Sequence, residues 1–286
     1  MKIDDYALLL KLNEVGTIRG TAKAVLISQP AVTQRLKYIE DYFGGAIFIR
    51  TSKSLLLTPA GEMILQHARK VMDEENTIMN ALAESSGDVQ GRLSIACSSL
   101  VSQRFLPSIL GKFTAAYPKV AVDLVTGLSE SIKREYKNYH VCIIRGEKLK
   151  ETVNDLLFDD PLYMFDTQPF PVDKLKERPL ISFKSDDSMH ELVDNWLYHH
   201  QAQIQPIKML HVDQIETCKQ FMKQGLGMAV LPGSVSASLM NDYPHIPLML
   251  DGKTITRATW VCYQEGVRRL PQVDQFLKAV SNETFI

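Results

Sequence analysis

The stretch GTIRGTAKAVLISQPAVTQRLKYIEDYFG, residues 16–44, decides the fold of the N-terminal part of this chain. Gly16 stands where a first helix over residues 3–15 would stop, because glycine readily adopts the left-handed conformation found at helix ends. Thr17 can then cap a second helix that runs to about residue 26. The apolar side chains of that short helix recur at helical spacing and predict its inward face, namely Ile18, Ala22 and Val25.

A third helix is expected after a short break at Ile27 and Ser28. Ser28 and Pro30 lie in its first turn, where the missing N–H of proline costs least, and the helix should end at residues 43–45. Apolar positions four and three residues apart predict a buried face made of Val32, Leu36 and Ile39. Two short helices joined by a tight turn have the layout of a helix-turn-helix.

The flanking segments extend this module. The first helix has apolar side chains at helical spacing, at Ile3, Tyr6, Ala7, Leu9 and Leu10. After the third helix, strand-like segments at residues 46–49 and 55–57 flank a polar turn, which predicts a β-hairpin wing. Thr58 and Pro59 then begin a helix expected to run to about Glu84.

The long helix after Pro59 has apolar positions close to a heptad pattern, at Leu65, Ala68, Met72, Met79 and Leu82. One interpretation is that this stripe packs against the chain's own domains. The other, which we favour because the preceding module is short, is that it pairs with a second copy of the chain.

The composition limits the class of protein. The chain has 286 residues, 45% of them hydrophobic and 23% charged, which is typical of a soluble globular protein with two or three domains. Four widely spaced cysteines form no CxxC pair, which argues against a zinc site or a disulfide framework and favours a cytoplasmic protein. The N-terminus lacks the pattern of a signal peptide, and no apolar run reaches the ~20 residues of a membrane helix.

Beyond a linker expected at residues 85–88, strand-like and helical segments alternate, which predicts an α/β region with largely parallel sheets. The strands are expected at residues 93–97, 120–126, 141–145, 207–211, 228–231 and 259–263. The helices are expected at residues 101–116, 189–200, 213–224 and 271–280.

The region between residues 15 and 58 has six basic and two acidic side chains, a net charge of 6 − 2 = +4 on a nearly neutral chain, which suits phosphate binding. Polar side chains of the third helix can reach base edges in a major groove. The predicted base contacts are Gln29, Pro30, Thr33 and Gln34. The predicted phosphate contacts, which position the protein without specifying sequence, are Thr17, Arg35, Lys37, Arg50, Thr51 and Lys53.

These segments resemble the LysR-type transcriptional regulators. SQPAVT at residues 28–33 is similar to the start of that family's recognition helix, and FIR at 48–50 and LTPAGE at 57–62 are similar to its wing and linker-helix entry. Two departures lie in the second helix, Gly20 in its middle and Thr21-Ala22 where a pair of alanines is usual. A further departure is the sequence His140-Val141-Cys142, where the family usually has one similar to Asp-Leu-Ala.

The resemblance covers the whole chain and implies an α/β protein with a helix-rich N-terminal module. It implies a winged helix-turn-helix at residues 1–58, a linker and dimerisation helix with a hinge at 59–90, and an effector domain at 91–286 that is similar to periplasmic binding proteins. One lobe of that domain would comprise residues 91–160 and 265–286, and the other 161–264. The implied partners are double-stranded DNA with a dyad-symmetric operator, a small-molecule effector, further copies in a homodimer or homotetramer, and RNA polymerase. No cofactor or metal ion is implied.

The effector is expected between the two lobes, and an anion is one option. Ser98-Ser99 ends a strand and opens a helix, where free N–H groups suit an anion, and matches the family's first effector segment. Arg145, at the end of another strand, could pair equally well with a ligand carboxylate or with an acid of the protein. Asp213-Gln214 aligns with the second lobe's contribution, although Asp213 is expected first of all to cap a helix. The predicted effector-binding residues are Ser98, Ser99, Thr126, Arg145, Asp213 and Gln214.

The alternative is a solute-binding or enzymatic α/β protein with an unrelated helical N-terminus. No GxSxG, HExxH or P-loop pattern is present, and the histidines are not at metal-ligand spacing. Gly225 and Gly227 follow a helix and enter a strand, which is not the context of a dinucleotide loop. Cys97 and Cys142 are interpreted as small buried side chains in preference to a redox pair. The sequence therefore favours a regulator that is not an enzyme.

Overall fold

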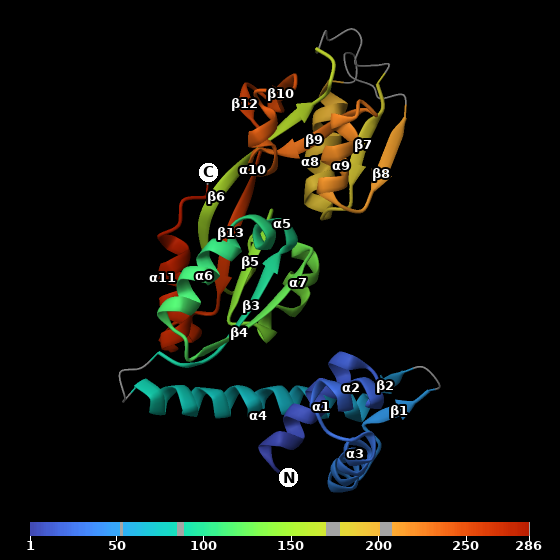
Figure 1. Ribbon diagram of the computed structural model, residues 1–286, viewed down its shortest axis with the longest axis vertical. Helices are drawn as coiled ribbons and strands as arrows, with labels where there is room; N and C mark the ends of the chain where they lie inside the picture. The colour runs from blue at the N-terminus through green and yellow to red at the C-terminus, as the bar shows by residue number, and fades with distance from the viewer. Residues whose placement is uncertain (52–53, 85–88, 170–177, 201–207, 286) are drawn as a thin grey trace. The chain divides into compact units, whose positions relative to one another are not determined.

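The computed structural model describes residues 1–51, 54–84, 89–169, 178–200 and 208–285, and the chain divides into two units, Met1–Gly91 and Arg92–Ile286 (Figure 1). Within the described residues no helix is both long and apolar enough to cross a membrane.

The N-terminal unit consists of helices and one hairpin. Its elements are α1 (Ile3–Val15), α2 (Ile18–Ala24), α3 (Gln29–Phe43), β1 (Phe48–Arg50), β2 (Leu55–Leu57) and α4 (Pro59–Glu84). The two strands pair antiparallel, with Phe48 opposite Leu57, and form the predicted wing. The helix-turn-helix, the wing and the long fourth helix are confirmed, and α1 and α4 have the predicted bounds.

Local hydrogen bonds explain where these helices begin. The Thr17 hydroxyl accepts a hydrogen bond from the N–H of Gly20 at 3.2 Å, and the Ser28 hydroxyl accepts one from Ala31 at 3.3 Å. Thr58 caps α4 in the same way through the N–H of Gly61, at 2.9 Å. Each bond satisfies a backbone donor that has no partner inside its own helix.

The two departures in α2 have packing reasons. A Cβ atom on Gly20 would lie 2.5 Å from Cγ1 of Val15 and 2.7 Å from Oγ1 of Thr17, so only glycine fits between α1 and the cap. Thr21 is fully buried, and its hydroxyl donates to the carbonyl of Thr17 at 2.9 Å. The hydroxyl that replaces a methyl group here is therefore satisfied inside the helix.

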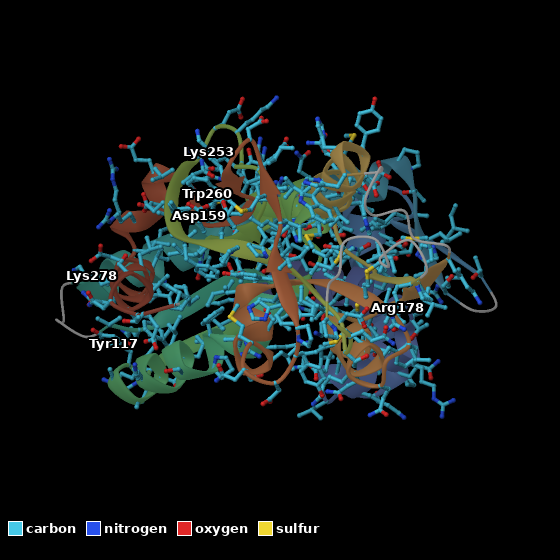
Figure 2. The ribbon with its side chains drawn as sticks, turned by 90° about the horizontal axis from the view of Figure 1, so that it is seen from above. Tyr117, Asp159, Arg178, Lys253, Trp260 and Lys278 are labelled. Atoms are coloured by element: carbon cyan, nitrogen blue, oxygen red, sulfur yellow. The ribbon has the colours of Figure 1, made fainter. Side chains whose placement is uncertain are left out.

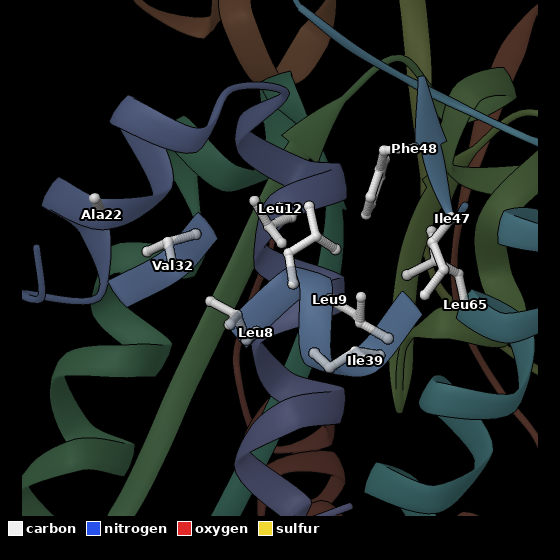
Figure 3. Close-up of a cluster of buried hydrophobic side chains, with 10 residues drawn as sticks. Leu8, Leu9, Leu12, Ala22, Val32, Ile39, Ile47, Phe48 and Leu65 are labelled. Carbon is white, nitrogen blue, oxygen red and sulfur yellow. The ribbon is translucent and has the colours of Figure 1, made fainter. Parts of the chain in front are cut away.

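The core of the N-terminal unit gathers apolar side chains from every helix of the unit and from the hairpin (Figure 3). The predicted inner face of α3 is confirmed, since its three members are fully buried. In α1, by contrast, the buried apolar side chains are Leu8, Leu9 and Leu12, whereas Ala7 of the predicted row is exposed. These three leucines join the core that the other helices and the hairpin build, where burying one leucine contributes about 1.5–3 kcal/mol.

The C-terminal unit contains a nine-stranded sheet. The strands follow the order β4-β3-β5-β13-β6-β9-β7-β8, with β10 paired to β6. Their bounds are β3 (Gly91–Ser98), β4 (Val120–Gly127), β5 (Val141–Arg145), β6 (Val153–Phe165), β7 (Leu180–Phe183), β8 (Met209–Val212), β9 (Met228–Pro232), β10 (His245–Pro247) and β13 (Thr256–Tyr263). A separate hairpin joins β11 (Met249–Leu250) and β12 (Lys253–Thr254).

The α-helices of this unit are α5 (Ser99–Arg104), α6 (Leu106–Ala116), α7 (Ser129–Glu135), α8 (Asp187–His199), α9 (Ile215–Lys223), α10 (Gly233–Ser236) and α11 (Pro271–Ser281). The single helix predicted over residues 101–116 is wrong, because the chain breaks at Phe105. Pro107 lies in the first turn of α6, and a proline inside one continuous helix would remove a backbone hydrogen bond.

The strand directions differ from the prediction of largely parallel sheets. β3 and β5 are parallel, as are β7 with β8 and β7 with β9. β6 and β13, however, pair antiparallel with each other, β13 also with β5, and β6 also with β9. The sheet is therefore mixed, with two long antiparallel strands in its middle.

Those two strands, β6 and β13, define the lobes (Figure 1). The first part of β6 pairs with β13, and the last part, from Leu162 to Phe165, pairs with β9. One lobe is thus built on β3, β4, β5 and β13, and the other on β7, β8 and β9. The expected second lobe of residues 161–264 included β13, but β13 pairs with β5 of the first lobe, with Cys262 opposite Cys142.

Candidate DNA-binding surface and effector cleft

The third helix has two contrasting faces. Val32, Leu36 and Ile39 are buried, whereas on the other side Gln29, Pro30 and Gln34 are exposed and Thr33 is half-buried. The Ser28 cap and Pro30 fix the start of the helix, so its first two turns present polar side chains to solvent. This is the arrangement that a helix needs to enter a major groove.

The predicted phosphate contacts are placed less uniformly. Lys37, Arg50 and Thr51 are exposed, while Thr17 is half-buried and its hydroxyl already accepts the capping bond. The backbone N–H of Thr51 and its hydroxyl both donate to the carbonyl of Ser54, so this residue closes the turn of the wing. Lys53 lies outside the described residues.

Arg35 has a structural partner that the sequence did not suggest. Its Nε donates to Oδ1 of Asp5 on α1, a fully buried carboxylate that also accepts the backbone N–H of Lys2 at 2.6 Å. The side chain of Arg35 is 39% exposed, and its guanidinium carbon lies 5.7 Å from the centre of the Tyr38 ring. Arg35 therefore links α3 to α1 while part of its guanidinium group remains accessible.

A cavity of about 220 Å³ lies between the two lobes of the C-terminal unit. Five of the six residues predicted to bind an effector line it, namely Ser98, Ser99, Arg145, Asp213 and Gln214. Thr126 does not line it; the wall at that point is formed by Gly127, Leu128 and Ser129. The structure thus brings together residues from strand ends that are far apart in the sequence.

Two buried ion pairs include residues that line this cleft, Arg145 in one pair and Arg257 with Asp186 in the other. Nη2 of Arg145 lies 2.6 Å from Oδ2 of Asp160, and Asp160 also accepts the N–H of Ser234 at 2.8 Å and its hydroxyl at 2.5 Å. Nη2 of Arg257 lies 2.5 Å from Oδ2 of Asp186. Of the two roles left open for Arg145, a partner within the protein is the one present, and the pair is buried.

Burial sets the electrostatics of both guanidinium groups. It lowers the pKa of Arg145 to about 10, while the charge of Asp160 acts in the opposite direction. Burial likewise lowers the pKa of Arg257, with Asp186 opposing the change. Both pKa values fall because a buried charge loses its hydration, and the two carboxylates recover part of that loss.

The lobes also contact each other directly beside the cavity. The backbone N–H of Glu130, in α7, donates to Oδ1 of Asp186 at 3.4 Å, and the N–H of Asp187 donates to Oε1 of Glu130 at 3.1 Å. Glu130 belongs to the first lobe, and Asp186 and Asp187 lie at the start of α8 in the second. These reciprocal bonds hold the two rims of the cleft together.

Several buried polar atoms at the cleft have no hydrogen-bond partner among the described residues. They are Oγ of Ser98, Nε of Arg145, Nε of Arg257 and Oγ1 of Thr259. The first three belong to residues that line the cavity. Buried donors without a partner cost free energy, so they mark a place where a ligand or water would be stabilised.

Sequence reasoning missed Arg257, Asp186 and Ser129 as residues of the cleft. A signal was available for Arg257, since it is a lone arginine inside the otherwise uncharged strand β13. The predicted cap role of Asp213 is wrong, because Gln214 occupies the N-cap position of α9 and makes no side-chain capping bond.

The four cysteines are buried and free. Burial raises the pKa of Cys142, Cys218 and Cys262 to about 12, and it also raises the pKa of Cys97. A thiol with such a pKa is protonated at neutral pH and is a poor nucleophile. Within the described part of the chain no group of three or more His, Cys, Asp or Glu side chains is placed to hold a metal ion.

Comparisons with known proteins agree with this arrangement. Residues 3–62 match the model for the bacterial regulatory helix-turn-helix protein of the lysR family, and residues 86–284 match the LysR substrate binding domain. The chain is 36% identical over 287 residues to the HTH-type transcriptional regulator YkuM of Bacillus subtilis (strain 168), covering 99% of this chain and 97% of YkuM. It is 29% identical to YraN of the same strain, over 99% of this chain and 98% of YraN.

Solved structures show the same fold at low sequence identity. CbnR, a LysR family transcriptional regulator, superposes with a TM-score of 0.66 at 19% identity, covering 99% of this chain and 100% of CbnR. A full-length OxyR variant from Pseudomonas aeruginosa gives a TM-score of 0.69 at 17% identity, covering 100% of this chain and 99% of OxyR. On the two domain matches and the 36% identity to YkuM, this chain belongs to the LysR family of DNA-binding transcription regulators with an effector-binding domain.

Proposed function

We propose that the chain binds a specific operator in double-stranded DNA through α3. The base contacts are Gln29, Pro30, Thr33 and Gln34, and the phosphate contacts are Thr17, Arg35, Lys37, Arg50, Thr51 and Lys53. The observation that carries this proposal is the division of α3, capped by Ser28, into a buried apolar face and an exposed polar face. A helix with that division can offer side chains to base edges without losing its packing.

We further propose that the protein acts in the cytoplasm as a homodimer or homotetramer on a dyad-symmetric operator, and that it contacts RNA polymerase. A full-length CbnR bound to its target DNA has a TM-score of 0.63 with this chain, which supports DNA as the partner. Within α4, Leu65 and Ala68 are buried inside the N-terminal unit, so the part of the helix left for pairing with a second copy lies beyond them. Residues 1–58, 59–90 and 91–286 are the proposed domains.

In the same proposal, a small-molecule effector with an anionic group binds between the lobes, and the protein performs no catalysis. Ser98, Ser99, Arg145, Asp213 and Gln214 are its proposed contacts, and Thr126 is left out because it does not line the cavity. A ligand that fits one arrangement of the lobes better than another shifts the population towards that arrangement. Such a shift could change the spacing of paired DNA-binding modules.

Fluorescence anisotropy with operator and scrambled DNA tests the first part. Gln29→Ala should reduce the preference for the operator by about 1–3 kcal/mol, because a base contact is lost. Lys37→Ala should weaken binding to both DNAs alike and reduce the slope of log affinity against log salt by about one. Equal effects of the two variants on both DNAs would contradict the division into base and phosphate contacts.

The effector proposal is best tested by Ser98→Ala. Replacing Arg145 would leave Asp160 buried without its partner, so loss of a ligand response in that variant would be hard to interpret. Oγ of Ser98 has no hydrogen-bond partner among the described residues, so its removal breaks no hydrogen bond to any of them. A ligand response that is unchanged in Ser98→Ala would remove Ser98 from the site.

A further inference from the structure

We infer that the cleft between the lobes takes a small zwitterion of the α-amino acid class, with its carboxylate on the first lobe and its ammonium group on the second. This inference rests on the proposed effector role of the cleft and names the ligand class. The proposed ligand thus has a cationic group in addition to the anionic group named above.

The charges around the cavity are balanced. Its lining contains three cationic side chains, Arg145, Lys184 and Arg257, and three anionic ones, Asp186, Asp213 and Glu216. A fourth carboxylate, Asp160, lies behind the lining and pairs with Arg145. A ligand with a net negative charge would meet at least as many fixed negative charges as positive ones, whereas a ligand with no net charge adds no imbalance.

The first-lobe wall offers donors to a carboxylate. Oγ of Ser98 is buried, lines the cavity and has no partner among the described residues. Nε of Arg145 and Nε of Arg257 are also buried without a hydrogen-bond partner among the described residues, because each arginine contacts its aspartate through Nη2 instead. These three N–H and O–H groups could be satisfied by ligand oxygen atoms without breaking either ion pair.

The second-lobe wall offers an acceptor to an ammonium group. Glu216 is already bound by Nζ of Lys219 at 2.9 Å and by Nε2 of Gln220 at 2.8 Å. Asp213 is exposed, lines the cavity, and takes part in no ion pair within the described residues. Its carboxylate is therefore the acid in the lining that remains free to meet a cation.

The size of the cavity limits the ligand further. A volume of about 220 Å³ is below the roughly 300–1,000 Å³ of pockets that hold drug-sized molecules, so it suits a compound with few heavy atoms. A zwitterion would join the donors of one lobe to the acid of the other. A carboxylic acid or an amine alone would meet only one wall and would favour closure of the lobes less.

The experiment measures thermal unfolding of the full chain with three matched sets of probes. The first set is the standard L-amino acids; the second is the corresponding carboxylic acids without the amino group; the third is the corresponding amines without the carboxylate. We expect at least one amino acid to raise the unfolding midpoint in a concentration-dependent way, and its two analogues to bind at least tenfold more weakly. A carboxylic acid that binds as tightly as its amino acid, or the absence of binding by any amino acid, would overturn the inference.

Two variants test the ammonium group and the carboxylate of the ligand separately. Asp213→Asn should weaken binding of the amino acid tenfold or more and have little effect on its deaminated analogue, because only the ammonium group loses its partner. Ser98→Ala should weaken both, because both have the carboxylate. Glu216→Gln is the matched control for loss of one negative charge from α9, and its effect should be smaller than that of Asp213→Asn. Equal effects of Asp213→Asn and Glu216→Gln on amino-acid affinity would reject the assignment of Asp213.

The failure of this inference is distinguishable from failure of the proposed function. If a simple carboxylate stabilises the chain and Ser98→Ala abolishes that effect, the cleft is an effector site and only the zwitterion is wrong. If an amino acid binds in the cleft but leaves affinity for operator DNA unchanged, the ligand class stands and its proposed regulatory role fails.

Discussion

The two units of this protein differ in how deeply their paired arginine side chains are buried. In the N-terminal unit, Arg35 is 39% exposed and uses one nitrogen to contact Asp5. In the C-terminal unit, Arg145 and Arg257 are buried, and each is bound to a buried aspartate. Part of the Arg35 guanidinium group therefore remains accessible to solvent, whereas Arg145 and Arg257 are occupied by internal carboxylates, so a ligand in the cleft must fit donors that those carboxylates leave unused.

The difference follows from dielectric environment. A half-exposed guanidinium keeps much of its hydration, so it stays solvated when its carboxylate partner is removed, and that removal costs less free energy. A buried one depends on its carboxylate, because removal of one partner leaves an uncompensated charge away from water. Four substitutions test how burial sets the cost of losing a polar interaction in each unit, in order of decreasing expected effect, and Asp160→Ala and Asp5→Ala compare the two kinds of arginine pair directly.

The largest effect is expected for Asp160→Ala. It leaves Arg145 buried without a partner and also removes the acceptor for Ser234, so the C-terminal unit should lose about 3–5 kcal/mol in free energy of unfolding. Urea unfolding measures this loss. The double variant Arg145→Met with Asp160→Leu should recover most of it, and a double variant as unstable as the single one would show that the charges are not the cause.

The second-largest effect is expected on the stability of the C-terminal unit when the pH is lowered. Burial lowers the pKa of His140 from 6.5 to about 4, with Arg92 lowering it further and Asp123 opposing, and Nδ1 accepts the N–H of Ser94 at 3.1 Å. Between pH 6.5 and 4 the unfolded state takes up a proton that the folded state does not, so stability falls as pH falls through that window, by at most about 3 kcal/mol.

In His140→Gln, stability should fall less steeply as the pH is lowered from 6.5 to 4, since glutamine cannot take up the proton. Thermal unfolding between pH 7 and 4 measures it, with exposed His199→Gln as a control for loss of a histidine. If stability falls equally steeply with pH in His140→Gln and in the unchanged chain, His140 is not the cause of that fall.

A smaller loss, about 2 kcal/mol, is expected for Asp5→Ala in the N-terminal unit. It removes the partner of Arg35 and the acceptor for the N–H of Lys2, but Arg35 can turn towards water. Urea unfolding compares this variant with Asp160→Ala. A loss as large as that of Asp160→Ala would break the contrast between the two units.

The smallest change is expected for Ser28→Ala, which removes the cap of α3 and should cost about 1 kcal/mol. Replacement by threonine, which can also cap, serves as the control. Circular dichroism during thermal unfolding measures both variants, and a negligible loss in Ser28→Ala would show that the start of α3 is fixed by Pro30 and tertiary packing instead.

Much of the N-terminal unit could be predicted from local signals. The caps at Thr17, Ser28 and Thr58 and the stop at Gly16 act within four residues of themselves, so the end of α1 and the starts of α2, α3 and α4 follow from the sequence. The buried face of α1 could not be predicted as well, because an apolar helix of this kind allows more than one face and only packing within the core of the N-terminal unit selects Leu8, Leu9 and Leu12.

In the C-terminal unit, the sequence alone determined that strands and helices alternate and that polar residues follow several strand ends. It did not reveal β6, because Asp155, Asp159 and Pro161 hide the strand pattern that two neighbouring strands nevertheless stabilise. Only the tertiary structure decided that Arg257 meets Asp186 across 71 positions and that Asp160 meets Ser234 across 74. Caps and periodicity depend on neighbours in the chain, whereas the cleft depends on which distant charges are buried together, and burial is a property of the folded whole.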